Sequence, residues 1–188
     1  MKLKNLLNEI KVKKLSQIMH KDAYNIITNS KRKLFKSRYD YTGIDDGEVW
    51  YVDFRIEIIR NKNLETPFTM KAWTDWMEDE TCEITIQILI HPKIGVVGTE
   101  DLDYDLVNVI THELEHVKQH DKSTHSNAVA KKYSGKGWEE YLYEDSEIEA
   151  HIRGIYEEAK KRKESFYNTA IRYFKANWDG LKNVDKYI

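Results

Sequence analysis

The sequence predicts an α+β fold with a small, mainly antiparallel sheet, and the periodicity of its apolar residues is the main reason. Residues 48–59 and 82–91 alternate apolar with polar side chains, as half-buried strands do. Residues 2–36, 102–120 and 141–178 instead place their apolar side chains at helical spacing. The order helix, strands, helix and long helix is that of an α+β domain.

Residues 1–36 form a basic region that we interpret as an amphipathic helical arm, followed by a main domain of residues 37–188. The arm holds ten Lys or Arg residues and only two acids. Its simplest role is that of a solvated helix whose lysines keep the chain soluble, and it is also a candidate docking surface for a protein partner. Nucleic-acid binding is a weaker alternative, because no nucleic-acid-binding module accompanies the basic side chains. Those side chains are Lys11, Lys13, Lys14, Lys31, Arg32, Lys33 and Lys36.

Each of the two predicted strands has one apolar face. In the first strand this face carries Trp50, Val52, Phe54, Ile56 and Ile58, and in the second it carries Ile84, Ile86, Ile88 and Ile90. We expect loops at residues 39–47 and 60–67, and a loop or frayed helix at residues 121–140. Residues 68–77 contain large aromatic side chains without a decisive period, so the sequence leaves this segment ambiguous.

The composition is that of a globular protein rather than a fibrous or membrane-spanning one. The 188 residues carry a net charge of −2, with 40% hydrophobic and 33% charged residues. No apolar run approaches the ~18 residues that a membrane span requires, and the basic N-terminus lacks the features of a secretory signal. Cys82 is the single cysteine, which excludes an internal disulfide and a Cys-rich zinc site. We therefore expect a protein of a reducing cytoplasm.

Residues 111–120, THELEHVKQH, contain the clearest chemical signal. His112 and His116 lie four positions apart, so on a helix both imidazoles reach the same side and can bind one metal ion. Glu113 follows the first histidine, where it can take a proton from a water that the metal activates, as in the H-E-x-x-H motif. An apolar stripe predicts that this helix packs into the core. The alternative is a pair of surface histidines on a charged helix.

A catalytic zinc site needs a third protein ligand, and residues 143–154 offer two candidates. No histidine follows the motif at the spacing of the H-E-x-x-H-x-x-G-x-x-H peptidases, so a carboxylate from a later helix is favoured. Glu147 shares a helix face with the small residues Ala150 and Gly154, which would let that helix approach the motif helix closely. Glu149 lies on another face and is the second choice.

The motif HELEH, followed about thirty residues later by a helical E-x-x-A at residues 147–150, resembles the gluzincin branch of the zincin metallopeptidases. In size and composition the chain looks most like small metallopeptidases encoded by bacteriophages. The resemblance implies that zinc is bound by His112, His116 and Glu147, with Glu113 as general base. It also implies that the substrate is a peptide or protein.

For the fold, the resemblance covers residues 80–160 and implies an antiparallel sheet whose edge strand borders the active site. Residues 82–91 would be that edge strand, along which a peptide substrate would lie as an added strand. Residues 102–120 would be the motif helix, and residues from 144 onward the glutamate helix. Many gluzincins have an aspartate four residues after the ligand glutamate, whereas this chain has His151 there.

Several other polar residues have weaker cases. His151, Tyr143 and Tyr156 are candidates to stabilise the negative charge that develops during peptide hydrolysis. His120 is expected at the surface, and as an extra ligand it would close the site. Structural roles are expected for His20, His91 and His125.

We therefore expect a zinc-dependent metallopeptidase in which Glu113 acts as general base. The alternative is a catalytically inactive zincin-fold protein that serves as a binding or structural component of a larger assembly, a viral one if a phage encodes it. Glu113 argues for catalysis, because a purely structural zinc site has no use for a base and closes its fourth position with another ligand. In either case we expect a cytoplasmic protein, found in the host cytoplasm or the virion if a phage encodes it.

Overall fold

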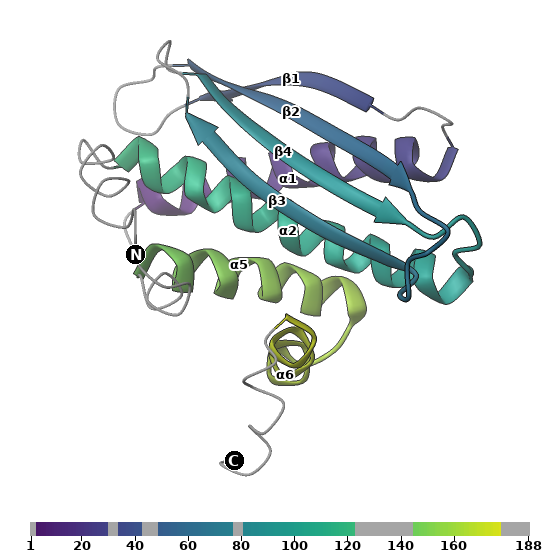
Figure 1. The fold of residues 1–188 in the computed structure, drawn as a ribbon. Coiled ribbons are helices and arrows are strands. Elements are labelled where there is room, and N and C mark those ends of the chain that lie inside the picture. Colours follow the sequence, from purple (N-terminus) through teal and green to yellow (C-terminus); the bar gives the residue numbers. More distant parts are fainter. Residues whose placement is uncertain (1–2, 30–33, 43–48, 77–80, 123–144, 178–188) are drawn as a thin grey trace, which may run out of the picture.

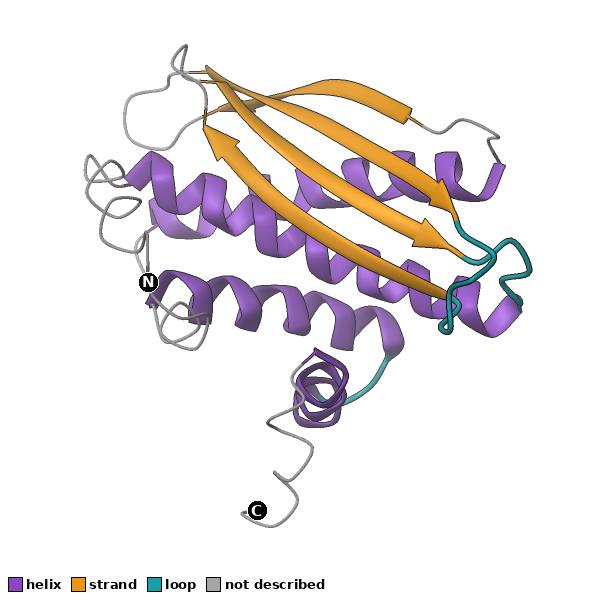
Figure 2. Ribbon diagram, viewed as in Figure 1, coloured by secondary structure: helices purple, strands orange, loops and turns teal. Residues whose placement is uncertain are grey.

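The computed structural model describes residues 3–29, 34–42, 49–76, 81–122 and 145–177. These residues confirm the α+β class, with four helices gathered on one side of a four-stranded sheet (Figure 1, Figure 2). The elements are α1 (Leu3–Asn29), β1 (Leu34–Thr42), β2 (Val49–Arg60), β3 (Phe68–Trp76), β4 (Thr81–Ile90), α2 (Val96–Lys122), α5 (Asp145–Arg162) and α6 (Phe166–Asn177). In this part of the chain, no helix combines the length and apolar character needed to cross a membrane.

The sheet is mixed rather than mainly antiparallel. Its strand order is β1-β2-β4-β3, in which β1 pairs with β2 and β3 pairs with β4 in antiparallel fashion, whereas β2 and β4 are parallel. The parallel pair arises because the chain leaves β2, forms β3 at the far edge, and returns to place β4 between them. The expectation that residues 82–91 form the edge strand is therefore wrong. β4 is central, and β3 is the edge strand on that side.

The sequences of β4 and β3 suit these positions. Most side chains of the isoleucine-rich β4 are buried, including some on the face away from the helices. The buried side chains on that other face are Thr81 and Thr85, which suits a strand covered by neighbours on both sides. β3, which was ambiguous in the sequence, alternates between half-buried and exposed side chains over its whole length. That pattern is expected of a strand covered on one face only.

One hydrophobic core lies between the sheet and the helices. The predicted inward faces are confirmed for Val52, Phe54, Ile56 and Ile58 on β2 and for Ile84, Ile86, Ile88 and Ile90 on β4, all at most 4% exposed. α2 covers this face with Leu106, Ile110, Leu114 and Val117. Burial of these side chains supplies the main favourable free energy of folding and fixes the position of α2 under the sheet.

α1 belongs to the same core. Its buried side chains recur every three or four residues, on one helix face: Val12, Leu15, Met19, Ala23 and Ile27. A hydrogen bond of 2.9 Å between the hydroxyls of Ser16 and Thr111 joins α1 to α2. The division of the chain into an arm and a main domain at residue 36 stays a prediction, and β1 already begins at Leu34.

Some predicted boundaries are wrong. The loop expected at residues 39–47 starts too early, because alternating tyrosines, which favour strands, continue β1 to Thr42. The motif helix is longer than residues 102–120 at both of its ends, since α2 spans Val96–Lys122. The rest of the loop at residues 39–47, and residues 123–140 of the other predicted loop, lie outside the described residues.

The long helix predicted over residues 141–178 is in fact two helices, α5 and α6. α6 runs across α5 (Figure 1). α5 ends at a left-handed residue, Lys163 (φ 57°), and the N–H of Glu164 bonds back to a carbonyl five residues earlier at 3.0 Å. This is the hydrogen-bond pattern of a Schellman helix end. The hydroxyl of Ser165 then accepts an N–H from the first turn of α6 and caps that helix. Periodicity alone misses the break, because Lys163 is not the glycine usual at this position.

Candidate metal centre

α2 carries the two histidines of the HELEH motif beside its core-facing stripe. Ile110 and Leu114 are fully buried under the sheet, whereas His112 and His116 meet the first turn of α5. The Nε2 atoms of the two histidines lie 3.0 Å apart, with their rings edge to face. The spacing of four residues therefore brings both imidazoles to one point, as the motif predicts.

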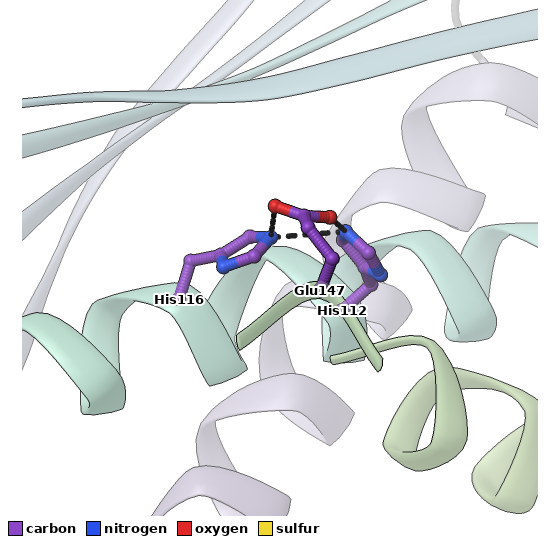
Figure 3. A group of neighbouring side chains, drawn as sticks. All are labelled: His112, His116 and Glu147. Carbon is purple, nitrogen blue, oxygen red and sulfur yellow. Dashed lines mark hydrogen bonds and ion pairs between the residues drawn. The ribbon is translucent and has the colours of Figure 1, made fainter. Parts of the chain in front are cut away.

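Glu147, in the first turn of α5, completes a group of three. Its Oε1 lies 3.2 Å from Nε2 of His116 and its Oε2 lies 3.6 Å from Nε2 of His112, and Figure 3 shows the carboxylate spanning both imidazoles. The three potential ligand atoms all lie within 4.8 Å of one another. Glu147 is only 5% exposed, whereas Glu149 is exposed to solvent. The geometry thus favours Glu147 as the third ligand.

Small residues allow α5 to approach α2 closely. Ala150 is fully buried, and a Cβ on Gly154 would lie 2.8 Å from the carbonyl oxygen of Asn108 and would overlap its side-chain oxygen. The amide of Asn108 donates to Oε2 of Glu158 on α5 at 2.7 Å. The close contact that the sequence predicts from these two small residues holds the helix of Glu147 beside α2.

Gln119 supports His116 from behind. Nδ1 of His116 lies 3.0 Å from Oε1 of Gln119, and donation of its proton leaves Nε2 free to bind a metal. The amide of Gln119 donates to the carbonyl oxygen of Ser146, one residue before Glu147, at 2.9 Å. Such a partner behind a ligand imidazole is usual in metal sites. Burial lowers the pKa of His116, but the hydrogen bond and charge of Glu147 outweigh it and raise that pKa.

Glu113 lies between the histidines and the edge strand. It is 6% exposed, and the hydroxyl of Thr74 on β3 donates to its Oε2 at 2.7 Å. No other described residue forms a hydrogen bond with this carboxylate. Oε1 therefore remains able to accept a proton, while Thr74 fixes the orientation of the group.

His151 and Tyr173 lie on the other side of His112. The ring of His151 is 4.4 Å from that of His112, centroid to centroid, and the hydroxyl of Tyr173 is 3.1 Å from Nδ1 of His151. Burial, followed by the electrostatic effect of the neighbouring His112, lowers the pKa of His151 to about 4. Burial also raises the pKa of Tyr173, so its hydroxyl stays protonated at neutral pH. His151 is not a member of the three-residue group.

A cavity of about 620 Å³ begins at His112 and Glu113 and follows α2 toward its N-terminus. Apolar side chains of β3 line one wall, namely Phe68, Met70 and Ala72, and Tyr173 lines another. At the far end lies an ion-pair network of Arg162 with Asp101, Asp105 and Glu158. A concave space of this size beside titratable side chains is where a substrate segment can bind.

The remaining candidates lie elsewhere. Tyr156 is 47% exposed and does not line the cavity, so the structure gives no support for a role in charge stabilisation. Tyr143, His125 and the side chain of His120 lie outside the described residues. His20 bonds to Asp103 and Lys161, and Nδ1 of His91 accepts the N–H of Lys93, which agrees with structural roles.

Three residues around the centre were not predicted from the sequence: Thr74, Gln119 and Tyr173. The signal for Gln119 was present, because it lies three positions after His116 on the same helix. No local pattern could identify the other two. Thr74 comes from a segment of ambiguous periodicity, and Tyr173 reaches the site only because the chain turns after α5.

The donor set fits zinc. Two imidazole nitrogens and one carboxylate oxygen are the ligands of many catalytic zinc sites, which leave a fourth position open. Among the described residues, no further histidine, cysteine or carboxylate joins this group. Comparisons with protein-family models, with curated proteins and with solved structures found no match for this chain. The assignment of a function therefore rests on the site itself.

Proposed function

We propose that this chain is a zinc-dependent metallopeptidase whose metal is held by His112, His116 and Glu147. The observation that carries the proposal is the position of Glu113, a buried carboxylate that lines the cavity with His112 and acts electrostatically on His116. A metal site that only stabilised the fold would gain nothing from this fourth charged group. Buried charges of this kind are expensive and concentrate at functional sites.

The chain's own residues would divide the chemistry among them. When bound, zinc supplies Lewis-acid polarisation of the substrate carbonyl and of an attacking water. Glu113 would take the proton of that water and pass it to the leaving amine, with Thr74 keeping the carboxylate in place. His151 would donate a hydrogen bond toward the negative charge that develops on the substrate.

We place the substrate along β3 rather than along residues 82–91. β3 is the edge strand beside α2, and its Thr74 contacts Glu113, so a peptide added to its outer edge would pass the metal centre. The adjoining cavity has an apolar wall formed by β3, beside the titratable side chains of the centre, and can accept a substrate side chain. These features support a peptide or protein substrate.

The relation to zincins, and to the phage-encoded members that the chain resembles, also remains a proposal. It is supported by the order of a sheet, the motif helix and a later helix that carries the glutamate. The mixed sheet with a central β4 differs from the antiparallel sheet that the resemblance implies.

The first experiment is elemental analysis of the purified chain beside His116→Ala. About one zinc per chain, lost in the variant, would support the metal centre. Wild type and Glu113→Gln would then be compared on a panel of unstructured peptides, with cleavage expected from the wild type only and equal zinc in both. Zinc-free wild type with an intact fold would refute the proposal and leave the binding or structural role as the leading hypothesis. Cleavage by Glu113→Gln at the wild-type rate would remove Glu113 from the mechanism.

A further inference from the structure

We propose that Tyr173 holds His151 outside the coordination shell of the metal centre and so keeps one coordination position open for the reaction. This inference rests on the proposed function, because it takes His112, His116 and Glu147 as the metal ligands. Tyr173 lies on α6, the helix that the sequence pattern did not separate from α5. This helix would then decide whether the metal centre keeps an open coordination position.

His151 is well placed to become a fourth ligand. It follows Glu147 by four residues on α5, so the two side chains are neighbours on one helix face. Its ring lies 4.4 Å from that of His112, centroid to centroid. Three imidazoles and a carboxylate around one zinc would form a closed shell of the structural type. In the present arrangement His151 does not join the group of ligand atoms.

The contact that keeps His151 apart comes from Tyr173. Its hydroxyl lies 3.1 Å from Nδ1 of His151, and the two rings pack against each other at 5.6 Å. A neutral imidazole has one acceptor nitrogen, and in our proposal that nitrogen is Nδ1, which accepts the phenol proton of Tyr173. The other nitrogen then carries the ring proton, so neither nitrogen offers a lone pair to a metal. His151 would have to break this hydrogen bond before it could bind.

An open position is what Glu113 requires. Its carboxylate can act as a base only if a water or substrate group binds between it and the metal ligands. With His151 in the shell, Glu113 would face a centre that has no place for a reacting group. The hydrogen bond between Tyr173 and His151 is therefore the feature that separates a catalytic centre from a structural one in this fold.

The test uses Co²⁺ in place of zinc, because its visible absorption reports the coordination shell, and azide as a small anion that binds an open position. Cobalt-loaded wild type should change its spectrum on addition of azide. Tyr173→Phe removes only the hydroxyl, and we expect it to bind Co²⁺ ~10-fold or more tightly, with no azide response and with loss of peptide hydrolysis. The double variant Tyr173→Phe/His151→Gln should regain the azide response. Tyr167→Phe, at a tyrosine 53% exposed on the same helix, is the matched control and should behave as wild type.

Two results would overturn the inference: an equal azide response in wild type and Tyr173→Phe, or no response in cobalt-loaded wild type, whose shell would then already be closed. A wild type that binds no Co²⁺ would instead refute the metal centre itself, and with it the inference. The measurement therefore separates failure of the Tyr173 assignment from failure of the proposed function.

Discussion

Gln119 connects the two helices that supply the proposed metal ligands. It accepts a hydrogen bond from Nδ1 of His116 and donates one to the carbonyl oxygen of Ser146, the residue before Glu147. One side chain thus orients a ligand imidazole and anchors the first turn of α5. Because both effects preorganise the centre, the contribution of Gln119 should appear in metal affinity rather than in stability of the fold.

Replacement Gln119→Ala should lower zinc affinity by ~10- to 100-fold, the usual effect of removing a partner behind a ligand imidazole. Competition against a chelator of known affinity would measure it. Gln17→Ala, at an exposed glutamine of α1, is the matched control and should leave the affinity unchanged. Unchanged affinity in Gln119→Ala would show that His116 is oriented by its other contacts.

Asp105 makes the stability of the protein depend on pH. Burial, followed by the negative charge of Glu158, raises the pKa of Asp105 from 3.8 to about 6. Between these values the folded protein binds a proton that the unfolded chain has lost. The free energy of unfolding therefore decreases as pH rises through this window, and the loss is complete above about pH 6.

Asp105→Asn cannot ionise and should escape this loss. At about pH 8 we expect the variant to be more stable than wild type by ~1 kcal/mol, well below the full value of the shift because the side chain is 45% exposed. The difference should shrink toward pH 4, where Asp105 is protonated in the wild type. Urea unfolding at both pH values tests this, and a difference that does not change with pH would show that folding does not raise the pKa of Asp105.

The grouping of His112, His116 and Glu147 could be predicted from the sequence because these residues lie on two helices with fixed internal spacing. His112 and His116 meet by helical period alone, and the small residues near Glu147 predicted a close contact between helices. Thr74 and Tyr173 could not be predicted in this way. Their places depend on the edge position of β3 and on the turn after α5, and both are long-range outcomes of packing.

Gly154 allows α5 to lie against the backbone of α2, because it has no side chain where it faces Asn108. A Cβ there would meet the backbone oxygen of Asn108 at 2.8 Å, and a backbone atom cannot move aside as a flexible side chain can. The proposed centre would take two ligands from α2 and one from α5. Separation of the two helices would therefore move Glu147 away from both histidines.

Replacement Gly154→Ala should both destabilise the fold and weaken metal binding. Alanine gains ~1 kcal/mol of helix propensity over glycine, but the clash should outweigh this gain and leave a net loss of ~1–3 kcal/mol. Chemical unfolding and zinc titration would measure the two effects. Gly95→Ala is the control, because a Cβ at Gly95 meets no atom within 4 Å. A more stable Gly154→Ala would mean that the helices separate at no cost.

Strand pairing was harder to predict than helix contacts. The alternation of β2 and β4 identified both strands and their buried faces, yet alternation does not say which strand lies at an edge. β4 is central because β3 pairs beside it at the edge, so the order of strands in the sheet differs from their order along the chain. That order comes from the whole fold rather than from any one segment.

α1 shares one core with the sheet and α2, to which it contributes five buried apolar side chains. Polar contacts add to this, since Asp103 on α2 bonds to His20 on α1 at 2.8 Å and to Lys161 on α5 at 2.7 Å. Uneven charge in the sequence suggested a separate arm, but charge describes only the solvent face of a helix. The buried face of α1 carries apolar residues at helical spacing, which the same sequence also displays.

Replacement of Met19 by alanine decides whether α1 is an arm or a part of the folded unit. Met19 is completely buried between α1 and the rest of the core, so its truncation should lower the free energy of unfolding by ~2–5 kcal/mol. Ile18→Ala, at the neighbouring side chain that is 43% exposed, should change it by no more than ~0.5 kcal/mol. Urea unfolding followed by tryptophan fluorescence is a suitable measurement, because α1 contains no tryptophan and the signal arises elsewhere in the chain. If α1 is an independent arm, the urea midpoint of the tryptophan transition should be the wild-type value in both variants. If α1 shares the core, that midpoint should fall strongly in Met19→Ala and stay near the wild-type value in Ile18→Ala.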